Sequence, residues 1–222
     1  MKLSDNEILY EDNHLLIIDK PSCLLTLPSE GVVDSALERS KIYLKEAYQK
    51  PGNVYLHQIH RLDRSASGIL VMAKTSKALS RLNEQIRDGL WEKTYLARTE
   101  KLPKEMQGEL IHYLKKEDYR TRVVAKGTPL AKEAHLTYKV RQDGLLEILL
   151  HTGRYHQIRA QLAAIGCPIR GDQKYGSTMK GASEGIDLHH AKLRFIHPVH
   201  KEIVTVYSKN CPFLRKDAKP FF

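Results

Sequence analysis

The chain has 222 residues and a formal net charge of +10, which favours a polyanionic partner, most simply nucleic acid. No apolar run approaches the roughly 20 residues that span a bilayer, and the polar start shows no apolar signal segment, so no membrane association is expected. The three cysteines are far apart and form no C-x-x-C pair, which argues against a disulfide framework or a zinc site and predicts a cytoplasmic protein.

The first sixty residues predict a β-hairpin, a helix and a short strand. Residues 8–19 form a strand, a polar turn and a second strand, which should stop at Pro21 because proline cannot donate to a ladder. Residues 34–48 predict a helix capped by Asp34. Residues 53–59 predict a short strand that leads into the sequence HRLDRSASG.

A buried strand and the clearest helix of the chain follow. Segment 68–74 is almost entirely apolar and predicts a strand that is buried on both faces. Residues 75–89 predict a helix, because Leu79 and Leu82 recur at helical spacing and Gly89 suits the C-terminal end.

The second half of the chain predicts mostly strands. Segment 91–98 predicts a strand with Lys93, Tyr95 and Ala97 on one face. Further strands are expected at 134–140, 145–151, 189–195 and 202–208, with a hairpin turn at Asp143-Gly144, a helix at 155–166 and a loop at 176–185. This strand-rich mixture predicts an α+β fold around a largely antiparallel sheet.

The segment HTGRYHQIRAQL, residues 151–162, places two arginines around the start of the predicted helix. Arg154 lies just before the helix, and Arg159 directly follows Ile158, near the edge of the apolar face. The pattern alone favours a surface arginine on an amphipathic helix. The alternative is an arginine whose planar guanidinium binds a carboxylate through two hydrogen bonds.

Other constellations indicate little chemistry. His57, His60 and Asp63 are three residues apart, but they lie on a predicted strand and loop, so a metal site is disfavoured. The sequence contains no phosphate loop, no dinucleotide fingerprint and no Gly-x-Ser-x-Gly, so no nucleotide or flavin cofactor is implied. Tyr95, taken alone, is most simply a sheet tyrosine with its ring in the core.

Five segments together resemble the RluA-type pseudouridine synthase family. In chain order, between about residue 8 and residue 198, they are LYEDNHLLIIDKP, HRLDRSASGILVMAK, EKTYLA, HTGRYHQIRAQLAAIGCPIRGDQKYG and LHHAKLRFIHP. The resemblance implies an α+β fold with a mixed, mostly antiparallel sheet, flanking helices and a central RNA-binding cleft. It also implies an isomerase that converts uridine in ribosomal or transfer RNA to pseudouridine, without a cofactor or a metal.

The resemblance further implies a minimal member of the family. One catalytic domain would occupy residues 1–222, without the S4 RNA-binding domain of many relatives, and it would act on an RNA stem-loop. A monomer is the default expectation, because no appended interaction element is visible in the sequence. Two features depart from the family pattern. Ala66 stands where the family has threonine, and the tail at 208–222 matches nothing that assigns it a role.

The family's site residues map onto this chain. Asp63 matches the catalytic carboxylate, Arg159 the arginine that pairs with it, and Tyr95 the tyrosine that stacks on the base and assists proton transfer at C5. Nearby positive charge would keep the carboxylate ionised. The residues expected to contact RNA are Arg61, which would take the place of the extruded nucleotide, and Arg64, Arg154, His60 and Gln157.

Two other functions remain open at this point. The chain could be a non-catalytic RNA-binding module on the same scaffold, or a metal-dependent nuclease or phosphoesterase. The intact set of Asp63, Tyr95 and Arg159 favours the synthase, because a binding module has no need for a carboxylate that faces phosphates. The sequence leaves open whether Asp63 attacks C1′, attacks C6 or assists elimination through a glycal.

Overall fold

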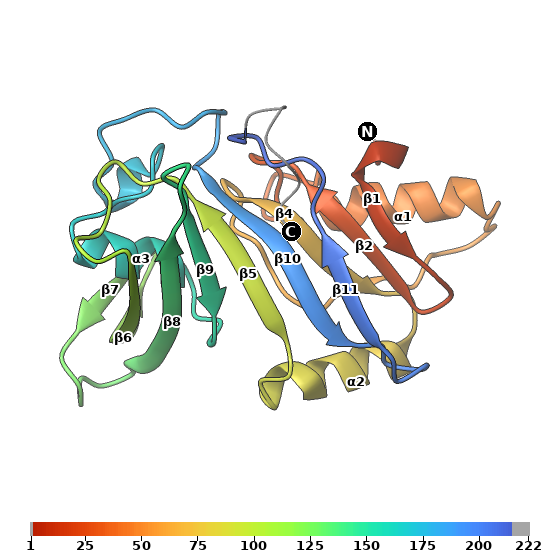
Figure 1. The fold of residues 1–222 in the computed structure, drawn as a ribbon. Helices are drawn as coiled ribbons and strands as arrows, with labels where there is room; N and C mark the ends of the chain where they lie inside the picture. The colour runs from red at the N-terminus through yellow and green to blue at the C-terminus, as the bar shows by residue number, and fades with distance from the viewer. Residues whose placement is uncertain (1, 215–222) are drawn as a thin grey trace. The chain divides into compact units, whose positions relative to one another are not determined.

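The computed structural model describes residues 2–214 and divides the chain into two compact units. The first unit holds residues 2–91 and 191–211, and the second holds residues 92–190 and 212–214. Strand β10 (Leu188–Ile196) supplies residues to both units. Figure 1 shows the elements in chain order by colour. No helix within residues 2–214 is long and apolar enough to cross a membrane.

The first unit is built on antiparallel strands and two helices. Its strand order is β1-β2-β4-β10, with β11 paired to β10 and β3 paired to β4. The elements are β1 (Ile8–Glu11), β2 (Leu15–Lys20), α1 (Ala36–Ala47), β3 (His57–Gln58), β4 (Ser67–Ala73), α2 (Ser76–Arg87) and β11 (Ile203–Tyr207), after a short 3-10 helix at Asp5–Glu7.

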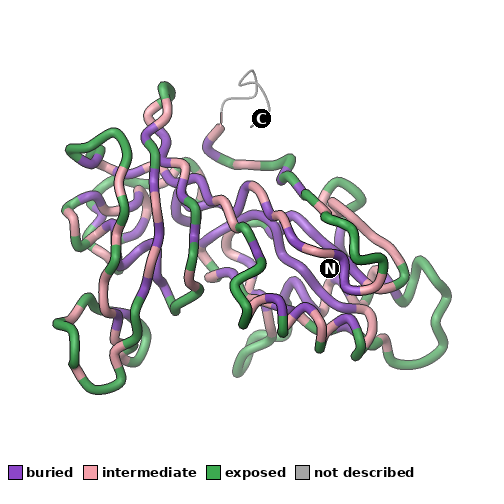
Figure 2. The backbone as a smooth tube through the Cα atoms, turned by 60° about the horizontal axis from the view of Figure 1, so that its bottom comes forward, coloured by how far each residue is buried: buried purple, intermediate pink, exposed green. Residues whose placement is uncertain are grey.

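Each face of β2 and β4 is covered by a helix. Leu15 of β2 packs in one cluster with Leu82 of α2, whereas Leu16 packs in another with Leu44 of α1. Because successive side chains of a strand point to opposite faces, a strand between two helices must be apolar along its whole length. The predicted burial of the strand at 68–74 on both faces is confirmed, and Figure 2 shows these strands in the buried colour.

The second unit contains the remaining antiparallel strands. Their order is β5-β9-β8-β6-β7, and α3 lies against β6 and β7. The elements are β5 (Glu92–Ala97), β6 (Gln107–Glu117), β7 (Arg120–Val124), β8 (Lys132–Val140), β9 (Leu146–Leu150), α3 (Gln157–Ala164) and a 3-10 helix at Gln173–Tyr175. The predicted α+β class with a mostly antiparallel sheet is confirmed.

Three local predictions differ from the structure. The cap of α1 is Ser35, whose hydroxyl accepts a hydrogen bond from the Glu38 amide, while Asp34 instead binds the Arg39 guanidinium at 2.6 and 2.7 Å. The strand expected at 53–59 shortens to the two residues of β3. The β6–β7 hairpin was not predicted at all, because its side chains are mostly polar and only partly buried.

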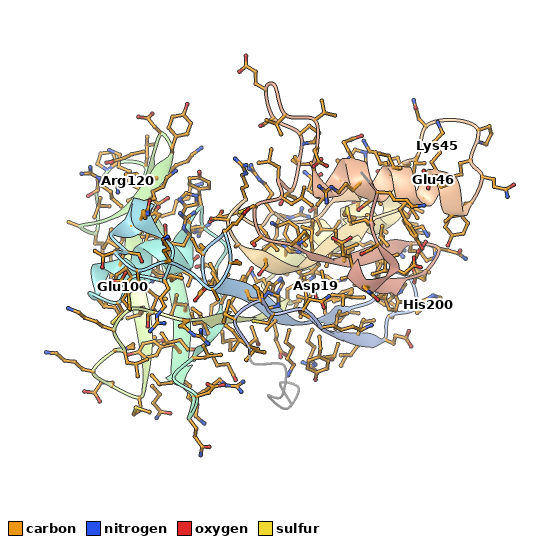
Figure 3. The ribbon with its side chains drawn as sticks, turned by 90° about the horizontal axis from the view of Figure 1, so that it is seen from above. Asp19, Lys45, Glu46, Glu100, Arg120 and His200 are labelled. Atoms are coloured by element: carbon orange, nitrogen blue, oxygen red, sulfur yellow. The ribbon has the colours of Figure 1, made fainter. Side chains whose placement is uncertain are left out.

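A buried carboxylate anchors the first residues of the tail that follows β11. The Oδ2 atom of Asp19 accepts hydrogen bonds from the Ser208 hydroxyl at 2.7 Å and from the Lys209 and Asn210 amides at 3.0 Å. Burial raises the pKa of Asp19, whose place on β2 is labelled in Figure 3. The tail for which the sequence predicts no role begins at residue 208. The structure describes its residues 208–214, and residues 215–222 lie outside the described residues.

We expect Asp19→Ala to release this anchored segment. The substitution removes the common acceptor of three donors, so it should cost about 1–3 kcal/mol of unfolding free energy. Hydrogen exchange at the Lys209 and Asn210 amides should accelerate together. Ser208→Ala, which removes one donor only, should have a smaller effect, and slow exchange of both amides in Asp19→Ala would contradict the anchor.

Candidate active site

The loop that carries Asp63 is tied to a buried lysine. Lys20 is 1% exposed, and its Nζ donates to the carbonyl oxygens of Pro21, Leu24 and Ala66 at 2.7 or 2.8 Å. Burial lowers the pKa of Lys20 to about 7, and the negative charge of Asp63 partly opposes this shift. The lysine thus joins the end of β2 to the loop before β4 and supplies positive charge beside the candidate carboxylate.

Asp63 lies half-buried in this loop between exposed arginines. The buried Leu62 exchanges hydrogen bonds with the Thr26 hydroxyl, and the carbonyl of Asp63 accepts from the Ala66 amide at 3.1 Å. Arg64 donates from Nε to the Cys23 carbonyl at 3.3 Å. Arg61 is exposed and has no hydrogen-bond or ion-pair partner within residues 2–214.

His60 supports the start of the same loop. Its Nε2 accepts a hydrogen bond from the Val71 amide of β4 at 3.2 Å, and its ring meets Trp91 edge-on at 5.7 Å. These contacts make His60 part of the framework that joins the loop to the core. Its predicted contact with RNA stays a prediction.

Tyr95 occupies the middle of β5 in the second unit. It is 7% exposed, and its ring stacks on His190 of β10 with 4.5 Å between centroids and 12° between planes. His190 is itself fully buried. The stack restricts the orientation of the tyrosine ring, and its predicted contact with a substrate base stays a prediction.

The turn between β9 and α3 is built around Gln157. Its Oε1 accepts from the Thr152 hydroxyl at 2.8 Å and from the Arg154 amide at 2.9 Å, and its Nε2 donates to the His135 carbonyl at 3.1 Å. Gln157 is buried, so these bonds assign it to the framework of the turn. Arg154 is exposed and donates from Nε to the Glu133 carbonyl at 2.8 Å.

Arg159 is buried, contrary to the surface position that the helical pattern favours. It is 5% exposed, and its Nε and Nη2 bind the two carboxylate oxygens of Asp172 at 2.7 and 2.8 Å. Its guanidinium also lies over the Tyr175 ring, 5.0 Å from the centroid. Helix α3 is buried on more than its apolar stripe, which is why the periodicity misplaced this side chain.

The predicted site residues are shared between the two units. His60, Arg61, Asp63 and Arg64 belong to the first unit. Tyr95, Arg154, Gln157 and Arg159 belong to the second. The pairing of Asp63 with Arg159, and the cleft that would hold RNA, stay predictions.

Three supporting residues were missed by the sequence reasoning. Lys20 was assigned no role, although a charged residue at the end of an otherwise apolar strand is a signal of a buried, compensated charge. Asp172 lay inside the quoted motif GDQKYG without a role, and His190 inside LHHAKLRF likewise. Nothing in the sequence says that these two side chains contact Arg159 and Tyr95.

One group of potential metal ligands occurs within residues 2–214, and it consists of Asp12, His197 and His200. The Nδ1 of His197 accepts from the Val199 and His200 amides, so in a neutral ring Nε2 carries the proton that it donates to Asp12 at 2.8 Å. Both ring nitrogens of His197 are therefore occupied within the protein. This geometry fits a structural hydrogen-bond network better than a metal site.

Comparison with known proteins gives a consistent result. A family model described as RNA pseudouridylate synthase matches residues 14–164, a span that includes all eight predicted site residues. The chain is 33% identical over 205 residues to the ribosomal large subunit pseudouridine synthase C of Buchnera aphidicola subsp. Acyrthosiphon pisum, covering 87% of this chain and 63% of that protein. It is 30% identical to the synthase D of Xylella fastidiosa, covering 97% and 71%.

A solved structure shows the same fold. Human RNA pseudouridylate synthase domain containing 4 superimposes with a TM-score of 0.74 at 24% identity, covering 91% of this chain and 87% of that one. At this identity the similarity concerns the fold alone. The chain spans 63% of the length of its Buchnera relative, so it corresponds to a part of that longer protein.

We expect Lys20→Met to destabilise the protein by about 1–3 kcal/mol, because it leaves buried carbonyl groups without their donor.

The pH dependence of the unfolding free energy gives a second measurement. Between the folded pKa of about 7 and the ordinary value of 10.5, the unfolded chain holds a proton that the folded chain has lost, so Lys20 makes stability rise with pH in this range. Urea unfolding at several pH values should show this rise in the wild type and not in Lys20→Met. The exposed Lys104→Met should behave as the wild type, and equal pH profiles for all three proteins would contradict the assignment.

We expect Asp172→Ala to cost about 3–5 kcal/mol, because it leaves the Arg159 guanidinium buried without its carboxylate. The matched control is Glu46→Gln, which breaks the exposed ion pair between Lys2 and Glu46. Glu46 lies on α1 and is labelled in Figure 3. That change should cost less than about 1 kcal/mol. Equal midpoints for the two variants in urea unfolding would show that the buried pair is not a structural requirement.

Proposed function

Because this chain belongs to the RNA pseudouridylate synthase family, we propose that it isomerises uridine in RNA to pseudouridine, with Asp63 as the catalytic carboxylate. The resemblance to the RluA-type enzymes is confirmed by the family match. One observation carries the proposal: the matched span contains Asp63, Tyr95 and Arg159, each in a motif of the expected composition.

The reaction is an isomerisation and needs no external reactant. The N1–C1′ bond of uridine breaks, the uracil turns within the site, and C5 bonds to C1′. The C5 proton is then lost, and N1 gains a proton. The protein must therefore supply a carboxylate at the sugar or base, a proton acceptor near C5 and a pocket that retains the free uracil.

We assign these tasks to the three predicted catalytic residues. Asp63 lies half-buried beside the positive charge of Lys20, and would act as the catalytic carboxylate. Tyr95, held by His190, would stack on the uracil and assist at C5. Arg159, oriented by Asp172, would fix the carboxylate through its guanidinium.

The target base must leave the RNA stack before it can reach these groups. Flipping costs a few kcal/mol, and least where a loop already exposes the base. Contacts to RNA phosphates from the net charge of +10 would offset this cost. In this proposal the exposed Arg61 would fill the vacated position, and the exposed Arg64 and Arg154 would contact the backbone.

Basic and aromatic side chains on the β6–β7 hairpin and on the segments beside it support an RNA partner. Lys126 lies 5.8 Å from the centroid of the Tyr113 ring, and Lys116 lies 5.1 Å from that of the Tyr155 ring. Arg120 of β7, labelled in Figure 3, lies 5.9 Å from the centroid of the Tyr175 ring. Interleaved cations and aromatic rings are typical of surfaces that bind phosphates and unstacked bases.

For the substrate we propose ribosomal RNA, transfer RNA or both, presented as a stem-loop. The names of the Buchnera and Xylella relatives, which refer to the large ribosomal subunit, support ribosomal RNA. We also propose a monomer in the cytoplasm, where a reducing environment suits the three cysteines, all of them free thiols.

We expect Asp63→Asn to reduce pseudouridine formation by at least about a thousandfold, because the amide cannot carry the negative charge. RNA affinity should be largely retained, since this side chain contributes no positive charge. Pseudouridine mapping in total RNA from cells with and without the protein would identify the substrate, and single-turnover assays on that RNA would give the rate.

The control is Asp88→Asn, which neutralises an exposed carboxylate at the end of α2 in the same unit. It should leave the rate unchanged. Near-normal turnover by Asp63→Asn would refute the assigned role. Absence of pseudouridine on every cellular RNA, together with intact RNA binding, would favour the non-catalytic RNA-binding module instead.

A further inference from the structure

Lys93 of β5 lies on the same face of the strand as Tyr95. Its directly opposed neighbour on β9 is Leu150, and that of Tyr95 is Ile148, both buried. Directly opposed residues of an antiparallel pair project to the same side of the sheet. An ammonium group therefore continues the apolar face that carries the candidate active-site tyrosine.

This ammonium has no hydrogen-bond or ion-pair partner among residues 2–214, although Lys93 is half-buried. Burial lowers the pKa of Lys93, which reflects a cost for holding the charge there. The two other buried cations discussed above are compensated: Lys20 by carbonyl groups and Arg159 by Asp172.

The lysine ends over the turn that precedes α3. A Cβ atom placed on Gly153 would lie 3.8 Å from the Lys93 Nζ, so the amine lies beside a stretch of backbone without a side chain. The turn is held by the bonds of Gln157 to Thr152 and Arg154. The Lys93 ammonium thus lies beside an exposed turn that is held by hydrogen bonds. Lys93 precedes Tyr95 by two residues in the sequence.

We propose that Lys93 binds a phosphate oxygen of the RNA backbone next to the target uridine while Tyr95 meets the base. A phosphate carries the full negative charge that offsets the desolvation of an ammonium, whereas a neutral carbonyl of the base does not. Lysine suits phosphate as a point charge with rotatable donors. The absence of a side chain at Gly153 leaves room for the sugar-phosphate chain. This inference rests on the proposed function, since it takes RNA as the ligand.

The test measures RNA binding apart from catalysis. Each variant is made in the Asp63→Asn background and titrated with a labelled oligouridylate, which offers a uridine flanked by phosphates at every position. Loss of one phosphate contact to a single strand should reduce the slope of log K against log salt by about 0.7. We expect Lys93→Gln to show this reduction, with affinity weaker by about tenfold at moderate salt. Lys93→Arg should retain both values.

The matched control is Lys139→Gln on β8. Lys139 is exposed and alternates with the buried Tyr138 and Val140, so it projects from the opposite face of the strands. It should leave the affinity and the slope unchanged. An equal loss in Lys139→Gln would show that the effect is one of total charge, and would overturn the proposed site.

Two further results decide the matter. An unchanged salt slope in Lys93→Gln, with a lower turnover in the active Asp63 protein, would assign Lys93 to the base and overturn the phosphate contact. Thermal unfolding separates misfolding from lost binding: removal of a half-buried charge should leave the midpoint of Lys93→Gln equal or higher. Failure of the wild type to form pseudouridine would refute the proposed function without changing this binding result.

Discussion

Lys20 places a positive charge in the interior of the first unit, where three backbone carbonyls and the charge of Asp63 surround it. Burial of an ammonium without such partners would cost too much free energy of folding. The loops that supply the carbonyl groups must therefore keep their conformations. The position of the Asp63 loop therefore depends on a residue at the end of β2. The same strand also anchors the start of the tail through Asp19.

In the second unit, an ion pair, a ring stack and hydrogen bonds hold the predicted site residues in place. Asp172 fixes the Arg159 guanidinium through both carboxylate oxygens, and His190 fixes the Tyr95 ring by stacking. Gln157 fixes the turn before α3 through three hydrogen bonds. The Tyr95 ring is thus held by a residue from a distant part of the sequence, and the Arg159 guanidinium by a residue 13 positions away. Catalytic groups require such support, because a displacement of about 1 Å can remove most of their effect.

Unlike Lys20 and Arg159, Lys93 has no compensating group among residues 2–214. Proteins rarely leave an ammonium half-buried and without a partner unless a ligand supplies the missing charge. The Lys93 ammonium lies near Gly153, on the face of β5 that carries Tyr95. This is the face that we expect to receive the uridine. A cost in stability at this position is consistent with a site that is completed only when RNA binds.

The sequence by itself determined the fold class, most elements and the family, because hydrophobic periodicity and ordered motifs are local properties of the chain. The all-apolar strand at 68–74 and the helix at 75–89 followed from spacing alone. Local pattern failed where a contact crosses a long stretch of sequence. Arg159 was placed at the surface because its partner Asp172 and the strands that cover α3 are not visible in a helical pattern. Only the tertiary structure decided that Lys20 is buried against the Asp63 loop, that His190 stacks on Tyr95 and that Lys93 has no partner among residues 2–214. These facts depend on which distant groups meet in space, and a single sequence does not record that.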